Sequence, residues 1–596
     1  MTDVLTLTLV FYEREPARIQ YIADTTSDPA HAEYGLHLDR EQLADLVVLP
    51  DEERQMVADW LTSFGMTVVE APDTGRQLMF VRATLSQVGA AFGEETVLRL
   101  NKSDDQHGTR IASAMPRRLA GYIQKVGGLP GERGQLGPLL PESVPENTQT
   151  TELDPAAELK DNRSVATQPK PHDLGGVTPS DIREIYDFPE NLDGSGETIA
   201  LMMLGGSPVE RDLHAFWNAF DIKAPEVHVV DVGYIRPRPP HPLHTLEAAM
   251  TLQWAGAMAP GAKLVAYRID PLVMGDPWAA FLLAVTSDKT LRPTIVCTSW
   301  ITPERRYYAL HGHSVVTGLL NQAAALGITV ISAAGDWGAF DGVPRTIKDG
   351  RYVSDAPWPH ATFPAVEERV LAVGGTMITH RSPLTEIAWS APPPPGMNKT
   401  LHFERIAGSG GFSEDVSIPE WQRPVLRGSY SRGAGTPAVV PYGRGFPDVA
   451  LMAAGPTVQR GPGEPLSSQG YQAVVGGNWI DYAGGTSVAA PIWAAIIALA
   501  NQARRSSGLS RLGFINPLLY KLHDARPAPF RSITAGAADV AMMVVNAHGR
   551  AVIYHLPGYE SLPGWDPVTG LGVPHVANLI QLVCSDTFAR RINQRE

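Results

Sequence analysis

The first part of the chain alternates short apolar runs with stretches whose apolar residues recur at helical spacing. Residues 40–49 and 51–64 place apolar side chains three and four positions apart, as amphipathic helices do. The pattern predicts an α+β module over residues 1–128. Its predicted strands, in which β-forming residues alternate or concentrate, are 5–12, 66–71 and 77–83.

A different pattern fills residues 129–175, which lack any sustained apolar period. Prolines stand at positions 130, 138, 141, 145, 155, 169 and 171. Segments of this composition are extended and exposed, and exposed segments are where proteases cut a folded chain. We expect this stretch to be a linker and the processing region.

From residue 176 onward, near-continuous apolar runs alternate with glycine-rich turns and helical stretches. Such runs indicate strands covered on both faces, as in a parallel sheet. The alternation predicts a three-layer α/β domain over residues 176–596. The predicted strands are 198–206, 262–269, 293–300, 328–336 and 369–376, and the predicted helices include 246–258 and 314–327.

Composition narrows the function classes. The chain has 596 residues and a net charge of −14, so nucleic acid is not an expected partner, because sequence-independent binding needs basic patches. The two cysteines, Cys297 and Cys584, exclude a disulfide framework and a thiolate zinc cluster, and we expect free thiols. The longest apolar run, Val488–Ala500, contains Pro491 and is far shorter than the roughly 18 residues of a membrane span, so no membrane partner is expected.

The strongest local motif lies at residues 482–502 (YAGGTSVAAPIWAAIIALANQ). Gly484 and Gly485 predict a tight turn, and Ser487 then opens a long apolar helix. A hydroxyl at a helix N-terminus lies beside free backbone N–H groups that can hold an oxyanion. The alternative is an ordinary helix cap, since Ser and Thr are common there.

The G-G-T-S-x-x-x-P-I string in this motif resembles the nucleophile motif of the sedolisins, the serine-carboxyl peptidases, and of their kumamolisin-like members in particular. Further resemblance extends from about residue 5 to residue 575, in the family's order. It implies a subtilisin-like three-layer domain with a parallel sheet, preceded by a ferredoxin-like α+β activation pro-domain. The matching segments are 31–47, 60–69, 81–93, 178–188, 331–339, 362–376, 409–422, 443–451 and 564–572.

The resemblance also implies the chemistry. Ser487 matches the nucleophile, Glu247 the general base, and Asp336 the carboxyl that donates a hydrogen bond to the oxyanion. A carboxylic acid can donate only when it is neutral, so activity at low pH is implied. A glutamate inside the apolar helix predicted at 246–258 is unusual, because an unpaired buried carboxylate is costly. The alternative is an exposed Glu247 on an amphipathic face.

Several positions depart from the family's pattern. Thr251, one helical turn after Glu247, stands where the family has the aspartate that orients this glutamate. His244, one turn before Glu247, is an alternative orienting residue. Met203 replaces an acidic residue, and Ile301 replaces a glycine that lets the substrate backbone approach closely.

A calcium site near the C-terminus is implied by the resemblance, and it is degenerate. Asp566 matches one of two aspartate ligands, while Ser532 stands in place of the other. The backbone carbonyls of Ile533, Leu562 and Gly564 match the remaining ligands. Affinity for Ca²⁺ follows the number and charge of the oxygen ligands, so the loss of one carboxylate weakens the site.

Two functions remain open. The first is a monomeric serine-carboxyl endopeptidase, made as a zymogen, with a peptide or protein substrate and its own pro-domain as intramolecular inhibitor. The second is a pseudopeptidase that binds peptides or proteins, which the departures at Thr251, Met203, Ile301 and Ser532 favour. An ester hydrolase ranks last, because the nucleophile turn reads G-T-S-V-A rather than G-x-S-x-G. Sedolisins are commonly secreted, which implies an extracellular protein, although the first residues show no secretory signal.

Overall fold

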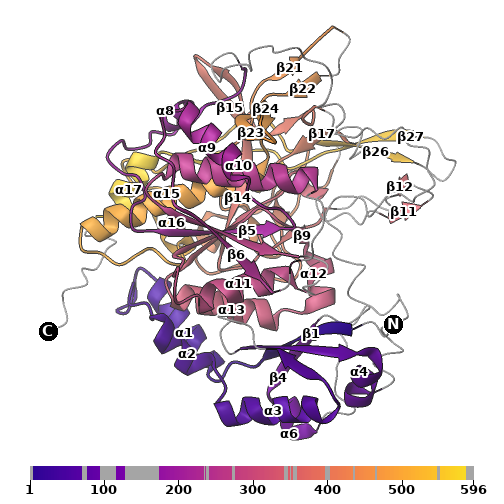
Figure 1. Ribbon diagram of the computed structural model, residues 1–596. Coiled ribbons are helices and arrows are strands. Elements are labelled where there is room, and N and C mark those ends of the chain that lie inside the picture. The colour runs from indigo at the N-terminus through magenta and orange to yellow at the C-terminus, as the bar shows by residue number, and fades with distance from the viewer. Residues whose placement is uncertain are drawn as a thin grey trace.

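A small N-terminal domain lies beneath a larger α/β domain, and its helices α1 and α2 lie on the side that faces the larger domain (Figure 1). The predicted linker, residues 129–175, falls outside the described residues except for its last two positions. The computed structural model describes residues 4–69, 77–93, 116–127, 174–233, 235, 241–270, 276–340, 346–348, 351–353, 359–395, 403–433, 436–462, 466–545 and 551–585.

The N-terminal domain is built on a four-stranded sheet with the strand order β2-β3-β1-β4. Its pairs are antiparallel, and its helices lie between β1 and β2 and between β3 and β4 as in a ferredoxin-like fold, which confirms the prediction. Two helices begin with capping boxes, Asp39 with Gln42 and Thr84 with Gln87, which satisfy free backbone N–H groups. The elements are β1 (Val4–Phe11), α1 (Pro16–Ser27), α2 (Arg40–Val47), α3 (Asp51–Ser63), β2 (Thr67–Val69), β3 (Leu78–Thr84), α4 (Leu85–Phe92), α6 (Arg117–Ala120) and β4 (Ile123–Gly127).

The larger domain is built on an eight-stranded sheet whose central strands are parallel, as the sequence predicts. The order is β15-β14-β10-β8-β5-β7-β6, with β20 also paired to β14 and the edge strand β15 antiparallel. Strands β5, β8 and β10 are buried almost throughout, which fits their apolar sequences. The bounds are β5 (Thr198–Leu204), β6 (Val227–Val232), β7 (Lys263–Ile269), β8 (Ile295–Thr298), β10 (Thr329–Ala333), β14 (Val370–Arg381), β15 (Leu384–Ala388) and β20 (Val449–Ala454).

Helices cover both faces of this sheet and complete the three layers (Figure 1). The helices α10 (Pro242–Met258) and α15 (Thr486–Ser506) pack on each other over one face, and α11 (Pro277–Ser287) packs on α13 (Ser314–Ala325) over the other. Helix α15 is long and apolar enough to cross a membrane, yet 83% of its most apolar window is buried within the domain. It is the central helix of this core.

Shorter elements surround the three layers. The helices are α8 (Pro179–Ile185), α9 (Glu210–Ala219), α12 (Glu304–His311), α16 (Asn516–Leu522), α17 (Val576–Val583) and the 3₁₀ turns η3 (Gly338–Phe340) and η4 (Arg423–Val425). The strands are β9 (Thr302–Pro303), β11 (Thr346–Lys348), β12 (Arg351–Val353), β13 (Thr362–Phe363), β16 (Ser390–Ala391), β17 (Phe403–Ala407), β18 (Gly411–Phe412), β19 (Gly445–Phe446), β21 (Thr457–Gln459), β22 (Leu466–Ser468), β23 (Tyr471–Val475), β24 (Asn478–Ala483), β25 (Phe530–Arg531), β26 (Val540–Val545), β27 (Ala551–Leu556) and β28 (Val573–Pro574). Cys297 and Cys584 are both free, as expected.

The two domains are joined by polar contacts as well as by packing of α1 against α13. The Gln322 amide donates to the Glu13 carboxyl at 2.6 Å. The backbone N–H of Leu38 donates to the carbonyl of Ala325 at 2.8 Å. The buried Arg40 guanidinium donates to backbone carbonyls of the larger domain. Charged and buried groups of the N-terminal domain therefore hold it on the helical layer that includes α13.

Candidate active site

The candidate catalytic side chains gather at the carboxyl ends of neighbouring parallel strands. Asp336 follows β10, and Ser299 follows β8. Glu247 reaches the same place from α10, and Ser487 from the first turn of α15. The carboxyl end of the strands is where open α/β sheets bind ligands. All four residues are partly exposed although the strands and helices around them are buried, so they are accessible from outside the core.

The turn before Ser487 has room only for glycine. Gly485 has φ +80°, and a Cβ atom on it would lie 2.5 Å from Oδ2 of Asp336. Such a conformation disfavours any L side chain, and the short distance excludes one sterically. The tight turn predicted from the sequence therefore has a second purpose, because it lets the Asp336 carboxyl lie directly against the backbone of the nucleophile turn.

Asp336 is held by the residue that precedes Ser487. The backbone N–H and the hydroxyl of Thr486 both donate to Oδ1 of Asp336 at 2.9 Å. The Thr486 hydroxyl in turn accepts a hydrogen bond from the backbone N–H of Gly335 at 3.0 Å. Burial raises the pKa of Asp336, while the two bonds from Thr486 oppose the rise. The carboxyl is thus fixed in place and pushed toward its neutral form.

Glu247 bonds to the nucleophile and to two other hydroxyls. Its carboxyl is hydrogen-bonded to the side chains of Ser299 and Ser487. The Thr251 hydroxyl donates to Oε1 of Glu247 at 3.5 Å, which is at the outer limit of a hydrogen bond. Burial raises the pKa of Glu247 to about 7, and the nearby Asp336 carboxyl adds to the rise. The hydroxyl bonds favour the charged form but do not cancel the effect of burial.

The structure also shows what surrounds the positions that depart from the family's pattern. The ring of His244 packs edge-on against Trp300, with centroids 5.1 Å apart, and lies 4.8 Å from that of His241. Met203 is 1% exposed and belongs to the core. Ile301 is partly buried and leads into β9, which pairs with β13. The alternative of an exposed Glu247 on an amphipathic face is wrong, because this residue is only partly exposed on a mostly buried helix.

The carboxylate of Asp566, a candidate calcium ligand, is occupied by hydrogen-bond donors from its own loop. The Asp566 carboxylate accepts four hydrogen bonds, from the backbone N–H groups of Leu562, Val568 and Thr569 and from the Thr569 hydroxyl. A carboxylate offers about four lone-pair sites, so all are taken. The Ser532 hydroxyl accepts a hydrogen bond from Gly564 N–H at 3.1 Å.

This donor set does not fit a calcium ion. Ser532 contributes a neutral oxygen, and Ile533 can offer only its backbone carbonyl. Among the residues that the structure describes, no two further acidic, His or Cys side chains join Asp566 in a group of three that could hold a metal ion. The degenerate site predicted from the sequence is therefore held together by hydrogen bonds, and calcium enters no step proposed below.

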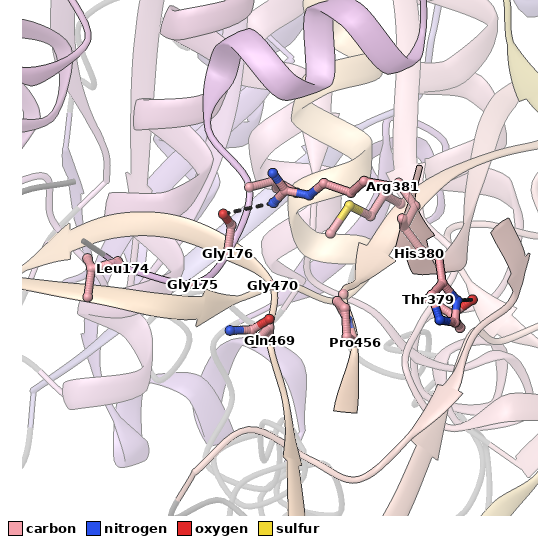
Figure 2. Close-up of a pocket in the computed structure, with 13 residues that line it drawn as sticks. Leu174, Gly175, Gly176, Thr379, His380, Arg381, Pro456, Gln469 and Gly470 are labelled. Carbon is pink, nitrogen blue, oxygen red and sulfur yellow. Dashed lines mark hydrogen bonds between the residues drawn. The ribbon is translucent and has the colours of Figure 1, made fainter. Parts of the chain in front are cut away.

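A cavity of about 370 Å³ lies where the predicted linker reaches the larger domain (Figure 2). Gly175, Gly176 and Arg381 line it, and the Arg381 guanidinium donates to the carbonyl of Gly176 at 3.0 Å. Val177 then pairs with Tyr471, the first residue of β23. The four residues Ser487, Glu247, Asp336 and Ser299 do not line this cavity, so it marks the anchored start of the domain rather than the candidate site.

Sequence reasoning assigned two residues of this site, Ser299 and Thr486, no contact with the candidate carboxyls. Thr486 belongs to the recognised G-G-T-S string, yet its bonds to Asp336 join positions far apart in the sequence. Ser299 directly follows the buried strand β8, and Asp336 lies three residues after the buried strand β10. Their shared place at the ends of parallel strands is the signal that could have identified Ser299. The Trp300 carbonyl next to it accepts a hydrogen bond from Trp278 at 2.9 Å.

Comparison with known proteins identifies two parts of the chain. Residues 1–131 match the family model "Pro-kumamolisin, activation domain", and residues 245–513 match the model "Subtilase family". Kumamolisin from Bacillus sp. (strain MN-32) is 35% identical over 412 residues, which cover 68% of this chain and 63% of that protein. Tripeptidyl-peptidase 1 of Homo sapiens is 26% identical over 602 residues, which cover 97% of this chain and 91% of that protein.

The fold has a counterpart among solved structures. Pseudomonas sedolisin, a serine-carboxyl proteinase solved with two molecules of pseudo-iodotyrostatin, matches with a TM-score of 0.51 at 22% identity. The match covers 69% of this chain and 99% of that one. The chain belongs to the sedolisin family, with a pro-kumamolisin activation domain ahead of its subtilisin-like domain.

Proposed function

We propose that this chain is the zymogen of a serine-carboxyl endopeptidase that hydrolyses peptide bonds in acid. The observation that carries the proposal is the meeting of three groups at one site. The Ser487 and Glu247 side chains interact, and Thr486 fixes the Asp336 carboxyl to the same turn. A nucleophile within reach of a base, with a third group placed for the oxyanion, is the arrangement that acyl transfer requires.

In the first step Ser487 attacks the peptide carbonyl while Glu247 takes its proton. A base with a pKa of about 7 can accept this proton and later return it to the leaving amine. The active form of this carboxyl pair has Glu247 charged and Asp336 neutral. Because burial raises the pKa of Glu247 to about 7, acid favours the neutral Asp336 but also reduces the fraction of Glu247 that is charged. Such a pair gives a bell-shaped dependence of kcat/KM on pH.

Asp336 stabilises the oxyanion in this proposal. Its Oδ1 accepts two bonds from Thr486, so Oδ2, which lies against Gly485, is the oxygen available to carry a proton. A neutral carboxyl there donates to the oxygen that becomes negative in the transition state. Loss of one such donor typically costs about 100- to 1,000-fold in kcat.

The N-terminal domain, residues 1–128, acts as the inhibitory pro-domain, and the linker 129–175 is cut on activation. The anchoring of Gly176 by Arg381, and of Val177 by Gly470, supports a cut upstream of these residues. After such a cut, the start of the peptidase domain at about residue 176 stays bound. The proposed peptidase is a monomer whose partners are its own pro-domain and a peptide or protein substrate.

A pseudopeptidase is the second candidate, and two observations favour it. Thr251 gives Glu247 a hydrogen bond of only 3.5 Å and no charge. The Trp300 carbonyl is already bonded to Trp278, and Ile301 next to it stands where the resemblance implies a glycine. In this second function the cleft would bind a peptide without cutting it.

The deciding experiment is an acid shift of the full-length protein from neutral pH to about pH 4, near the pKa values of ordinary carboxyls. The matched control is Ser487→Ala, and intact mass is the readout. We expect the wild type to lose its first 130–175 residues while the variant stays whole. If neither chain is cut, and a casein-type substrate also survives, the peptidase proposal fails and the pseudopeptidase function stands.

A further inference from the structure

A serine hydroxyl connects the candidate base with the nucleophile's own backbone. Ser299 lies at the carboxyl end of β8, and its Oγ donates to the carbonyl of Ser487 at 3.2 Å. The same hydroxyl is hydrogen-bonded to the Glu247 carboxyl. Ser299 therefore contacts both partners of the proposed proton transfer from a rigid, fully buried strand.

The aspartate that orients the base in related sequences is replaced by Thr251, which makes a weaker contact. Its hydroxyl is 3.5 Å from Glu247, and the side chain is 4% exposed in the core. A hydrogen bond of this length contributes little to orientation. Thr251 is therefore a weak support for Glu247, and the Ser299 and Ser487 side chains also interact with this carboxyl.

We propose that Ser299 is the positioning residue that orients Glu247 toward Ser487 in place of the missing aspartate. The inference rests on the proposed function, since it concerns the same proton transfer. Ser299 touches neither the scissile bond nor the oxyanion in this proposal, and it acts through Glu247.

The single proton of the Ser299 hydroxyl makes this contact sensitive to the charge of Glu247. When Glu247 is charged, it can only accept, so Ser299 donates its proton to the carboxylate. When Glu247 is protonated, its own O–H donates to Oγ of Ser299, whose proton then goes to the Ser487 carbonyl. The hydroxyl thus holds the base in both protonation states by reversing the direction of one hydrogen bond.

In the part of the chain that the structure describes, three further titratable groups lie near Glu247. Asp336 lies across the site on the loop after β10, and Cys297 lies on β8, where burial raises its pKa so that the thiol stays neutral. His244 lies on the same helix, one turn away, with its ring against Trp300. All of these remain in a Ser299 variant, so a change in the pH profile of that variant reports on the contact between Ser299 and Glu247.

The first test is the pH dependence of peptide hydrolysis by Ser299→Ala, Ser299→Thr, Thr251→Ala and the control Ser332→Ala. Ser332 is a buried hydroxyl on β10 that bonds to a backbone carbonyl of its own strand. We expect Ser299→Ala to lose up to about 100-fold in kcat with KM little changed, because a misplaced base costs this much. The acidic limb of the profile should shift upward in pH, since the charged base loses a donor.

The rescue and the controls separate positioning from folding. Ser299→Thr keeps a hydroxyl and should recover most of kcat, and Ser332→Ala should stay within a few-fold of wild type. Thr251→Ala should lose less activity than Ser299→Ala. A larger loss in Thr251→Ala than in Ser299→Ala would overturn the proposal, because Thr251 would then be the orienting residue. A Ser299→Ala enzyme with the same pH profile as the wild type would also overturn the proposal.

A second readout does not need activity. Thermal unfolding is followed between pH 5 and pH 8 for Ser299→Ala, Glu247→Gln and the double variant, all in the full chain carrying Ser487→Ala. We expect Ser299→Ala to change the pH dependence of Tm when Glu247 is present and not in the Glu247→Gln background. Equal changes in both backgrounds would overturn the assignment of Ser299, whereas a chain that never cuts any peptide would overturn the proposed function instead.

Discussion

At the residue scale, the oxyanion carboxyl lies against a backbone that has no space for a side chain. A Cβ on Gly485 would meet Oδ2 of Asp336 at 2.5 Å, and the residue has φ +80°. We expect Gly485→Ala to abolish processing and peptide hydrolysis, because Asp336 must move. The positive φ should also cost about 1–2 kcal/mol of unfolding free energy. Intact mass after an acid shift and thermal unfolding measure the two effects.

Gly508→Ala is the matched control for Gly485→Ala. Gly508 follows the other end of the same helix with φ +71°, and a Cβ there would meet no atom within 4 Å. This variant should lose a similar amount of stability and still process itself. Equal loss of processing in both variants would show that strain in the helix, rather than the contact with Asp336, causes the effect.

The sequence predicts the candidate residues better than it predicts their contacts. Ser487, Glu247 and Asp336 stand out because each belongs to a local motif, and the structure brings them to one place. The bonds from Thr486 to Asp336 and from Ser299 to Ser487 join residues 150 and 188 positions apart. No periodic pattern carries such information, because these contacts depend on how strands are ordered in the sheet.

At the element scale, the predicted strands and helices agree with the structure where the apolar pattern is long. The runs that became β5 and β10 are buried throughout or nearly so, and α13 lies within its predicted range. Short elements such as β9 and β13 were not predicted, since two residues carry no period. The docking of α1 on α13 was also not predicted, because an apolar helix face does not indicate which element packs against it.

One histidine at this docking surface makes the contact sensitive to pH. The His37 imidazole Nε2–H donates to the carbonyl of Arg511 at 3.2 Å, and its ring lies against Gly327 and Gly513. Burial lowers the pKa of His37 to about 4, and the charges of Arg511 and Arg504 act in the same direction. The docked histidine is therefore neutral, while an undocked one would gain a proton below its ordinary pKa of 6.5.

We expect docking of the N-terminal domain to weaken as pH falls from about 6.5 to about 4, and to lose nothing further below that. The sign follows from linkage, because the undocked state binds more protons over this window. Glu13 opposes the effect, since burial raises its pKa and acid then favours the docked state. His37→Gln keeps the donor to Arg511 and does not titrate, so it should preserve docking at pH 4.5.

Hydrogen exchange of α13 measures this docking in the full chain carrying Ser487→Ala, which cannot cut itself. The expected result is that α13 is less protected at pH 4.5 than at pH 7, after correction for intrinsic exchange, and that His37→Gln removes most of the difference. Equal loss of protection with and without His37→Gln would assign the pH effect to other groups, such as Glu13 or the ion pair of Asp24 with Arg369.

At the scale of the whole molecule, the peptidase domain contains carboxyls that favour an acidic medium even outside the candidate site. Glu304 and Glu367 are 2% and 5% exposed, and burial raises the pKa of each to about 7. The charge of Glu304 also raises the pKa of Glu367, and the charge of Asp415 raises that of Glu304, since like charges repel. The two carboxyls are therefore largely neutral in acid and become a cost to folding near neutral pH.

The direction of this effect on stability follows from the raised pKa values. The folded state holds these protons up to about pH 7, whereas the unfolded chain releases them near the ordinary value of 4.5. The contribution of these two groups to the free energy of unfolding should therefore be greatest below pH 4.5 and should fall as pH rises to 7. A shift of this size for one carboxyl corresponds to roughly 3 kcal/mol.

Glu367→Gln tests this directly, because Oε1 of the amide can still accept the hydrogen bond that the Tyr308 hydroxyl donates at 2.8 Å. The Glu304 carboxyl is less suitable, since a backbone N–H donates to its Oε2 and an amide nitrogen there would face that donor. We expect Glu367→Gln to raise Tm at pH 7.5 and to leave it nearly unchanged at pH 4.5, measured in the full chain carrying Ser487→Ala. The control Glu404→Gln removes an exposed carboxyl from the same domain and should change neither value. A Tm that falls at pH 7.5 in Glu367→Gln would mean that the charged carboxylate stabilises the fold, and the acid preference of the molecule would then have to arise at the candidate site alone.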